Sequence, residues 1–243
     1  MSRALAFALL PIVVRQGRKL RRDIPRLPPP ADAWSGGDSA PSALQLLVVG
    51  DSTAVGTGVE SMTEALAGHL VRRLKAAGGR GRTVGWRVVG SNGATSAQVL
   101  DRHRATILSE ATDIAVVLVG WNDTLRLRSG TAYAHELSAL LDALRGGNPG
   151  IRMVVVAPPS FGRFTVLPQP LRAALGLHAR GLARVARRVA AEFDAGYAPG
   201  FDGASLASDR FHPDGEGYRN LADGVMTALS RMPASSLGGP AAL

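Results

Sequence analysis

One serine, one histidine and one aspartate in this sequence have the types and spacing that nucleophilic catalysis requires. Ser52 follows a glycine and an aspartate, and Asp209 and His212 lie three residues apart near the end of the chain. A serine hydroxyl is a weak nucleophile until a base removes its proton, and histidine is the usual base. A carboxylate on the other ring nitrogen fixes the tautomer and the orientation of the histidine. We therefore expect Ser52 to attack an acyl carbonyl, with His212 as base and Asp209 as its partner.

The oxyanion that such an attack creates needs hydrogen-bond donors that are already in place. We expect three donors: the backbone N–H of Ser52 at the entrance of a helix, the N–H of Gly93 and the side-chain amide of Asn122. Gly93 has no Cβ that would obstruct the substrate. Gly90 remains an alternative to Gly93, because both glycines belong to the same short segment.

The elements that must position these residues alternate along the chain. Four apolar runs are typical of buried strands, at residues 44–49, 84–89, 114–119 and 151–156. Helical patterns cover residues 64–75, 96–108, 133–145, 171–193 and 215–231. Apolar strands that alternate with helices indicate a parallel sheet covered on both faces. Such sheets bind ligands at the carboxyl ends of their strands, where we expect the candidate residues to meet.

Four blocks of this sequence, in order, resemble those of the SGNH hydrolases, also called GDSL esterases and lipases. The first three blocks each follow a strand run, and the last precedes the final helix. The blocks are Gly50-Asp51-Ser52, with Thr53 where the family motif has leucine; Gly93; Gly120-Trp121-Asn122-Asp123, which matches Gly-x-Asn-Asp; and Asp209-Arg210-Phe211-His212, which matches Asp-x-x-His. Each block alone is a weak signal, so the resemblance depends on the complete set.

The resemblance covers about residues 44–231 and implies both a fold and a site. The implied fold is a three-layer α/β/α, flavodoxin-like arrangement with a central parallel sheet of about five strands. The implied reaction is the hydrolysis of ester or thioester bonds. In this resemblance Ser52 is the nucleophile, Asp209 and His212 complete the catalytic triad, and Gly93 and Asn122 are oxyanion donors.

Several other classes of protein are excluded by composition or by missing motifs. The chain has 243 residues, of which 46% are hydrophobic, and it has no cysteine. Disulfide scaffolds, thiolate metal sites and cysteine nucleophiles are therefore excluded. The sequence has no Gly-Lys-Ser/Thr and no His-Glu-x-x-His, and residues 56–61 lack the last glycine of a dinucleotide fingerprint. We expect neither a cofactor nor a metal, although Asp209, His212 and Asp214 offer an alternative set of metal ligands.

The positive net charge is concentrated at the start of the chain. The formal net charge is +9; residues 1–30 contain seven basic residues and one acidic one, whereas residues 31–243 contain 21 basic and 18 acidic residues. The body has a nearly balanced charge and few aromatic residues, which argues against a groove for nucleic acid.

Residues 1–30 form a separate segment that combines apolar and basic residues. An apolar run at 4–14 is too short to span a bilayer, and a basic cluster follows it at 15–22, where a signal peptide would have a cleavage site. This combination suits peripheral contact with a membrane surface. The alternatives are a helix that packs on the domain, a frayed tail or a signal sequence. We expect a linker at 31–43, the hydrolase domain at 44–232 and a loose tail at 233–243.

The resulting functional prediction is a serine esterase that forms an acyl-enzyme on Ser52. Its substrates would be small esters, thioesters or lysophospholipids, and the N-terminal segment favours esters met at a membrane. An O-acetyltransferase or a sugar ester deacetylase would use the same machinery. A non-catalytic membrane-surface module is a further alternative. We expect a cytoplasmic protein, with a peripheral, exported or membrane-anchored form as alternatives.

Overall fold

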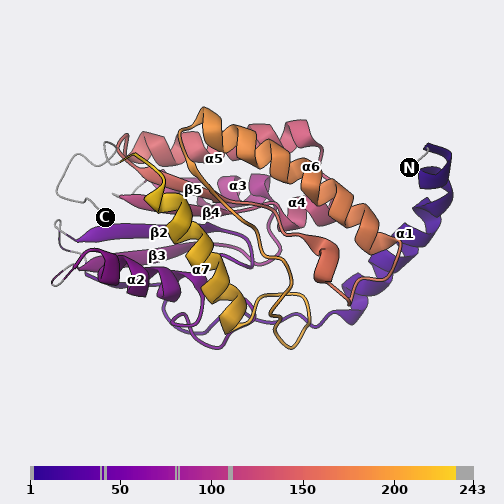
Figure 1. Cartoon of the computed structure of the whole chain (residues 1–243), viewed down its shortest axis with the longest axis horizontal. Coiled ribbons are helices and arrows are strands. Elements are labelled where there is room, and N and C mark those ends of the chain that lie inside the picture. Colours follow the sequence, from indigo (N-terminus) through magenta and orange to yellow (C-terminus); the bar gives the residue numbers. More distant parts are fainter. Residues whose placement is uncertain are drawn as a thin grey trace.

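The fold is built on a six-stranded sheet with helices on both faces (Figure 1). The computed structural model describes residues 3–38, 40, 43–79, 81, 83–108 and 112–233, so the predicted tail lies almost entirely outside the described residues. The strand order is β1-β3-β2-β4-β5-β6, and every neighbouring pair is parallel except β1 and β3. The strands are β1 (Ser35–Gly37), β2 (Leu44–Gly50), β3 (Val84–Gly90), β4 (Ile114–Leu118), β5 (Arg152–Val156) and β6 (Gly196–Ala198).

Helices cover the two faces of the sheet and complete three layers. Helices α2 (Leu66–Ala77) and α7 (Gly215–Ser230) pack together on one face. Helices α3 (Ser96–Leu108), α5 (Gly130–Gly147) and α6 (Leu171–Glu192) lie on the other. A short helix, α4 (Trp121–Leu125), and a 3₁₀ turn, η1 (Phe161–Arg163), follow β4 and β5. The predicted α/β fold with a central parallel sheet is confirmed.

The central strands are apolar on both sides because both faces of the sheet are covered. In β2, Leu46 and Val48 belong to the core beneath α2 and α7, whereas Leu47 and Val49 belong to the core beneath α3 and α5. Successive side chains of a strand point to opposite faces, which explains this alternation. Burying each such side chain contributes roughly 1.5–3 kcal/mol before the entropic cost of ordering it. The core therefore fixes the strands whose carboxyl ends carry the candidate site.

The sheet has six strands, whereas the resemblance implied about five. The two three-residue edge strands, β1 and β6, have no apolar run in the sequence, and backbone pairing holds them in place. The Val88 amide donates to the Trp34 carbonyl beside β1, and the Ala157 amide donates to the Ala198 carbonyl in β6. The segment predicted as a linker, 31–43, thus includes a strand of the sheet.

Helix boundaries differ from the predicted ones by a few residues, for local reasons. Helix α5 begins at Gly130 instead of residue 133, because the Ser129 hydroxyl caps it by accepting a hydrogen bond from the Ala132 amide at 3.1 Å. Helix α2 begins at Leu66 instead of residue 64, because the backbone forms a series of turns and bends after β2.

The N-terminal segment forms helix α1 (Arg3–Asp23), which packs against the domain through its second half. Val13, Leu20 and Ile24 contact the core on the α2 and α7 side. Gln16 donates to the Gln169 carbonyl at 2.8 Å and accepts from the Leu171 amide at 3.2 Å, which ties α1 to the start of α6. Across the described part of the chain, no helix combines the length and apolar character needed to cross a membrane.

Candidate active site

The structure brings Ser52, His212 and Asp209 together in one hydrogen-bonded chain. His212 Nε2 lies 3.0 Å from Ser52 Oγ, and His212 Nδ1 lies 2.6 Å from Asp209 Oδ2. The serine follows β2 and the other two residues precede α7, so residues 160 positions apart in sequence meet at the carboxyl end of the sheet. In this geometry the imidazole can accept the hydroxyl proton through Nε2 while Asp209 holds the proton on Nδ1.

The Asp209 carboxylate is buried but well supplied with donors. Its Oδ1 accepts the backbone N–H groups of Phe211 at 2.9 Å and of His212 at 3.0 Å. Burial alone would raise the pKa of Asp209, but the hydrogen bonds from the ring and backbone of His212 and from Phe211 outweigh it. The pKa of Asp209 therefore lies below its ordinary value, and the carboxylate stays ionised beside the imidazole.

A short loop fixed at both ends holds the aspartate and the histidine. Leu206 and Pro213 form an isolated antiparallel bridge, and the Ala207 amide donates to the His212 carbonyl at 2.9 Å. Asp214 then caps α7 by accepting from the Gly217 amide at 2.9 Å, and its other oxygen accepts from the Ser205 hydroxyl at 2.8 Å. The loop cannot shift without breaking the cap, so the position of the imidazole is tied to the start of α7.

Ser52 lies in the turn that follows β2 and is almost fully buried, with a relative exposure of 3%. We expected its N–H to lie at a helix entrance, and this expectation was wrong. The first helix after β2 begins only at Leu66, and the intervening residues form turns and bends. Within this turn the Thr57 amide donates to the Ser52 carbonyl at 3.0 Å, which holds the serine backbone.

The two predicted oxyanion residues beyond Ser52 lie on the loop after β3 and in helix α4, and these two segments contact each other. The Ala94 amide donates to the Ser91 carbonyl at 3.1 Å, and Gly93 occupies the third position of this turn with φ +74°. This backbone conformation favours glycine. The Asn122 side-chain amide donates to the Ala94 carbonyl at 3.0 Å through Nδ2. One of its two N–H groups remains for another acceptor.

The alternative residue, Gly90, is accounted for by the sheet itself. Gly90 is the last residue of β3 and pairs with Gly50 of β2. A Cβ at Gly90 would lie 2.3 Å from the Gly50 carbonyl oxygen, so close strand approach requires glycine there. A Cβ at Gly93 would meet nothing within 4 Å, so that position is open. This contrast favours Gly93 as the residue beside the substrate.

A buried polar network fixes the helix that carries Asn122. The Asp123 carboxylate accepts the Ser96 amide at 3.1 Å and the Ser96 hydroxyl at 2.7 Å, which links α4 to the start of α3. Glu136 of α5 also contacts the Ser96 hydroxyl at 2.7 Å and pairs with Arg128. The network explains why an aspartate follows Asn122.

The residue before α4 must be a glycine. Gly120 has φ +115°, and a Cβ there would lie 2.7 Å from the Pro158 ring.

Trp121 is a site residue that we did not predict as functional. Its indole ring is nearly parallel to two other rings: that of His212, with a centroid distance of 5.9 Å and an interplanar angle of 13°, and that of Phe201, with 6.3 Å and 20°. The edges of Phe164 and Phe211 surround the same ring. The sequence places Trp121 directly before Asn122, but only the tertiary packing shows that it supports the imidazole.

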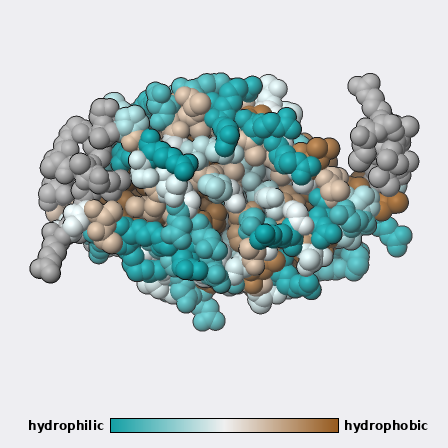
Figure 2. Space-filling model, viewed as in Figure 1, coloured by the Kyte–Doolittle hydropathy of each residue, from teal (hydrophilic) through white to brown (hydrophobic). Residues whose placement is uncertain are grey.

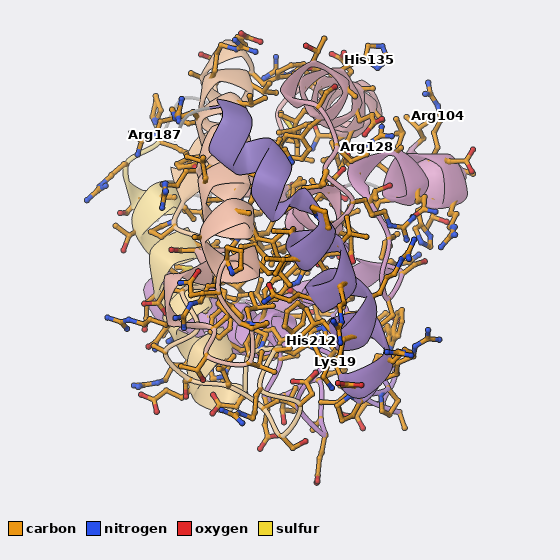
Figure 3. The ribbon with its side chains drawn as sticks, turned by 90° about the vertical axis from the view of Figure 1, so that its right-hand side faces the viewer. Lys19, Arg104, Arg128, His135, Arg187 and His212 are labelled. Atoms are coloured by element: carbon orange, nitrogen blue, oxygen red, sulfur yellow. The ribbon has the colours of Figure 1, made fainter. Side chains whose placement is uncertain are left out.

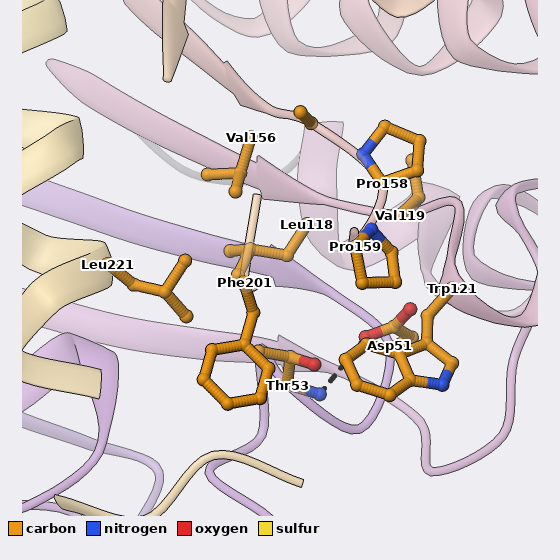
Figure 4. A pocket seen from close by; sticks show the side chains of 11 residues that line it. Asp51, Thr53, Leu118, Val119, Trp121, Val156, Pro158, Pro159, Phe201 and Leu221 are labelled. Carbon is orange, nitrogen blue, oxygen red and sulfur yellow. Dashed lines mark hydrogen bonds between the residues drawn. The ribbon is translucent and has the colours of Figure 1, made fainter. Parts of the chain in front are cut away.

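A small pocket lies beside Trp121 and the turn that carries Ser52 (Figure 4). Asp51 and Thr53 contribute to it from either side of Ser52, and the remaining lining is mainly apolar, from the ends of β4 and β5 and from Phe201 and Leu221. Burial raises the pKa of Asp51 to about 7, and the Asp123 carboxylate adds to the shift, whereas the hydrogen bond from the Thr53 amide opposes it. Asp51 is thus a buried carboxyl that resists ionisation.

Within the part of the chain that the structure describes, no group of three His, Asp or Glu side chains is arranged to hold a metal ion. Asp214, which we considered with Asp209 and His212 as an alternative ligand set, caps α7 instead. Asp209 therefore bonds the His212 ring, whereas Asp214 caps the start of α7.

Comparison with known proteins identifies a family and a shared fold. The model of the GDSL-like lipase/acylhydrolase family matches residues 48–219. The GDSL-like esterase Rv1075c of Mycobacterium tuberculosis is 30% identical over 213 residues, which are 82% of this chain and 65% of that relative. The chain therefore spans slightly less than two thirds of the length of this relative.

Two solved structures share the fold at low sequence identity. The crystal structure of TesA matches with a TM-score of 0.62 and 23% identity, over 78% of this chain and 99% of that one. A carbohydrate acetylesterase family member from Sinorhizobium meliloti matches with a TM-score of 0.57 and 21% identity, over 78% of this chain and 98% of that one.

Proposed function

The chain belongs to the GDSL-like lipase/acylhydrolase family, and we propose that it is a serine esterase that hydrolyses carboxylic esters through an acyl-enzyme on Ser52. The observation that carries the proposal is the hydrogen-bonded chain from Ser52 Oγ through His212 to Asp209. A nucleophile, a base and an orienting carboxylate at these distances form the minimum set for acyl transfer to serine.

In the proposed mechanism, Ser52 Oγ attacks the acyl carbonyl while its proton moves to His212 Nε2. Asp209 stabilises the imidazolium that forms, because the aspartate remains ionised at neutral pH. The N–H groups of Ser52 and Gly93 and the free N–H of Asn122 donate to the oxyanion. The imidazolium then protonates the leaving alcohol, which breaks the ester C–O bond and leaves the acyl group on Ser52.

Water completes the reaction by hydrolysing the acyl-enzyme, with His212 and the oxyanion donors acting a second time. His212 Nε2 accepts a proton from water, whose oxygen attacks the acyl carbon of the Ser52 ester. The second tetrahedral intermediate uses the same oxyanion donors. Collapse of this intermediate returns the proton to Ser52 Oγ and releases the carboxylic acid. The substrates that we propose are carboxylic esters, with thioesters and lysophospholipids as variants of the same reaction.

The test is the hydrolysis of p-nitrophenyl esters, from acetate to palmitate, by the wild type and by Ser52→Ala. We expect the wild type to release p-nitrophenol and Ser52→Ala to lose nearly all turnover. Ser160→Ala is the matched control, because Ser160 is an exposed serine that follows β5 at the same end of the sheet. Equal turnover by Ser52→Ala and the wild type would exclude Ser52 as the nucleophile.

The same assay separates hydrolysis from transfer to another acceptor. Adding an alcohol or a sugar with free hydroxyl groups changes the products if that acceptor replaces water. A constant ratio of acid to p-nitrophenol, with or without the added alcohol, supports the hydrolase. A rate that depends on the acceptor supports an acyltransferase instead.

A further inference from the structure

Helix α1 has a packed face and an outer face of opposite character. Val13 and Leu20 are seven residues apart, which places them on one side of the helix, and together with Ile24 just after its end they pack on the domain. The opposite side is basic. We define the basic face of α1 as four exposed side chains: Arg15, Arg18, Lys19 and Arg22.

The charge of the basic face is not neutralised within the described residues. Lys19 pairs with Asp23 in the next turn, and Asp23 is the only acidic residue among the first thirty. Arg15, Arg18 and Arg22 have no ion pair with any described residue. Like charges three and four residues apart on a helix repel one another, so this spacing does not stabilise α1 by itself. An external negative charge would relieve the repulsion.

Apolar side chains accompany the basic face. Ile12 and Val14 are 47% and 43% exposed, and they are two of the five large hydrophobic side chains exposed among the described residues. The helix continues toward its start through an apolar stretch, 4–10. Figure 2 shows apolar colouring reaching the surface at the right-hand end, near α1. A helix that carries apolar and basic residues side by side suits the boundary between lipid headgroups and acyl chains.

The position of α1 connects this surface to the candidate active site. Gln16 bonds to the segment before α6, and Asn92, the neighbour of Gly93, donates to the Leu27 carbonyl at 3.2 Å just after α1. Figure 3 shows α1 crossing the front of the molecule at the end that faces the viewer, where His212 is also labelled. A surface that binds the outer side of α1 would therefore lie beside the site.

We propose that the basic face of α1, with the flanking apolar side chains, docks this protein on an anionic membrane surface. The partner is a lipid bilayer whose headgroups carry negative charge. Phosphate groups balance the three unpaired arginines, and the exposed Ile12 and Val14 enter the headgroup region. The docking places the site against the bilayer, so the esters that reach Ser52 are those of lipids; this last step rests on the proposed function.

A bilayer fits these observations better than a soluble partner. Nucleic acid would need a basic groove with aromatic stacking, but the basic residues here occupy one exposed helix face beside aliphatic side chains. A soluble acidic protein would balance the arginines but would leave the exposed Ile12 and Val14 in water. A bilayer accommodates both features at once.

The experiment is co-sedimentation of the full chain with phosphatidylcholine vesicles, with and without phosphatidylglycerol. The variant is Arg15→Gln/Arg18→Gln/Arg22→Gln, and the control removes the same charge from exposed arginines of α3 and α6, Arg102→Gln/Arg104→Gln/Arg184→Gln. We expect binding only to the anionic vesicles, weakened roughly 100-fold in the α1 variant, since each basic residue near such a surface contributes about a fivefold gain. We expect the control to bind like the wild type.

Three results would overturn the docking proposal. They are no binding to anionic vesicles, equal weakening in both variants, or binding that is unchanged by added salt, which screens such charges. Thermal unfolding of each variant verifies that it is folded. Ser52→Ala separates the two proposals, because it should bind vesicles normally while losing hydrolysis. The α1 variant should hydrolyse p-nitrophenyl acetate in solution at the wild-type rate.

Discussion

Replacing Asp209 by asparagine tests the orientation of His212 more sharply than deleting the side chain. Asp209 Oδ1 accepts two backbone N–H groups, from Phe211 and His212, and Oδ2 faces His212 Nδ1 at 2.6 Å. The asparagine carbonyl should keep the two backbone hydrogen bonds, since its NH₂ group cannot accept them. The NH₂ group must then occupy the place of Oδ2 and donate to Nδ1.

This arrangement reverses the tautomer of the imidazole. With Nδ1 acting as acceptor, the proton of neutral His212 moves to Nε2, which faces Ser52 Oγ at 3.0 Å and can no longer take its proton. The comparable change in a serine protease lowers kcat about 10⁴-fold, or about 5.4 kcal/mol of transition-state stabilisation. We expect a loss of that size in kcat for p-nitrophenyl acetate, with little change in unfolding temperature.

The control is Asp202→Asn, which changes an exposed carboxylate that pairs with Arg163 on the surface. It should retain wild-type kcat. If Asp209→Asn kept kcat within about tenfold of the wild type while Ser52→Ala was inactive, the assignment of Asp209 as the orienting carboxylate would be refuted. The expected loss in kcat of about 10⁴-fold comes from the wrong tautomer of the histidine, so a small loss would mean that Asp209 does not set the tautomer.

Four further predictions follow from single side chains. Asn122→Ala should lower kcat about 10²- to 10³-fold, whereas Asn92→Ala on the neighbouring loop should not; equal effects in kinetic assays would remove Asn122 from the oxyanion site. Trp121→Ala should destabilise the fold by about 3–5 kcal/mol in urea unfolding, because it empties a buried aromatic cluster, and Trp121→Phe should cost less. Gly93→Ala should cost about 1–2 kcal/mol, measured in the same way, because φ is +74° in otherwise open space. Asp51→Asn should make the slope of stability against pH more positive between about pH 4 and pH 7; an unchanged slope would contradict the raised pKa.

The direction of the Asp51 effect follows from proton binding. The folded protein holds the Asp51 proton up to about pH 7, whereas the unfolded chain releases it near the ordinary value of 3.8. Between these values the folded state binds more protons, so stability falls as the pH rises. The full difference corresponds to about 4 kcal/mol. The slope of wild-type stability against pH should therefore be more negative than that of Asp51→Asn over this range.

The central strands and the long helices were predictable because their signal is local. Each of the four central strands is an apolar run that both faces of the sheet bury. The edge strands β1 and β6 were not predictable, since three residues such as Ser35–Gly37 pair through backbone atoms and show no pattern of side chains. The start of α2 was predicted two residues early because the turns after Ser52 extend further than the sequence indicates.

The candidate site was predictable as a set of residues but not as an environment. The four sequence blocks that resemble the family motifs contain Ser52, Gly93, Asn122, Asp209 and His212. The carboxyl ends of parallel strands lie at one edge of the sheet, which explains why the structure brings these residues together. The contacts of the Trp121 indole with His212 and Phe201 join three segments that approach one another only in the fold. The packing of α1 likewise depends on where the segment before α6 lies.

Two buried aspartates near the site show why residue type alone does not assign a role. Asp51 and Asp209 both have less than 4% relative exposure, and Asp51 is next to Ser52 in sequence. Burial dominates at Asp51 and raises its pKa, whereas the donors from His212 and Phe211 prevail at Asp209 and lower its pKa. Only a carboxylate that stays ionised can stabilise an imidazolium at neutral pH. Both carboxyls accept backbone N–H groups, but only Asp209 also accepts a hydrogen bond from the ring of His212, and this contact distinguishes the catalytic aspartate from the one buried beside Ser52.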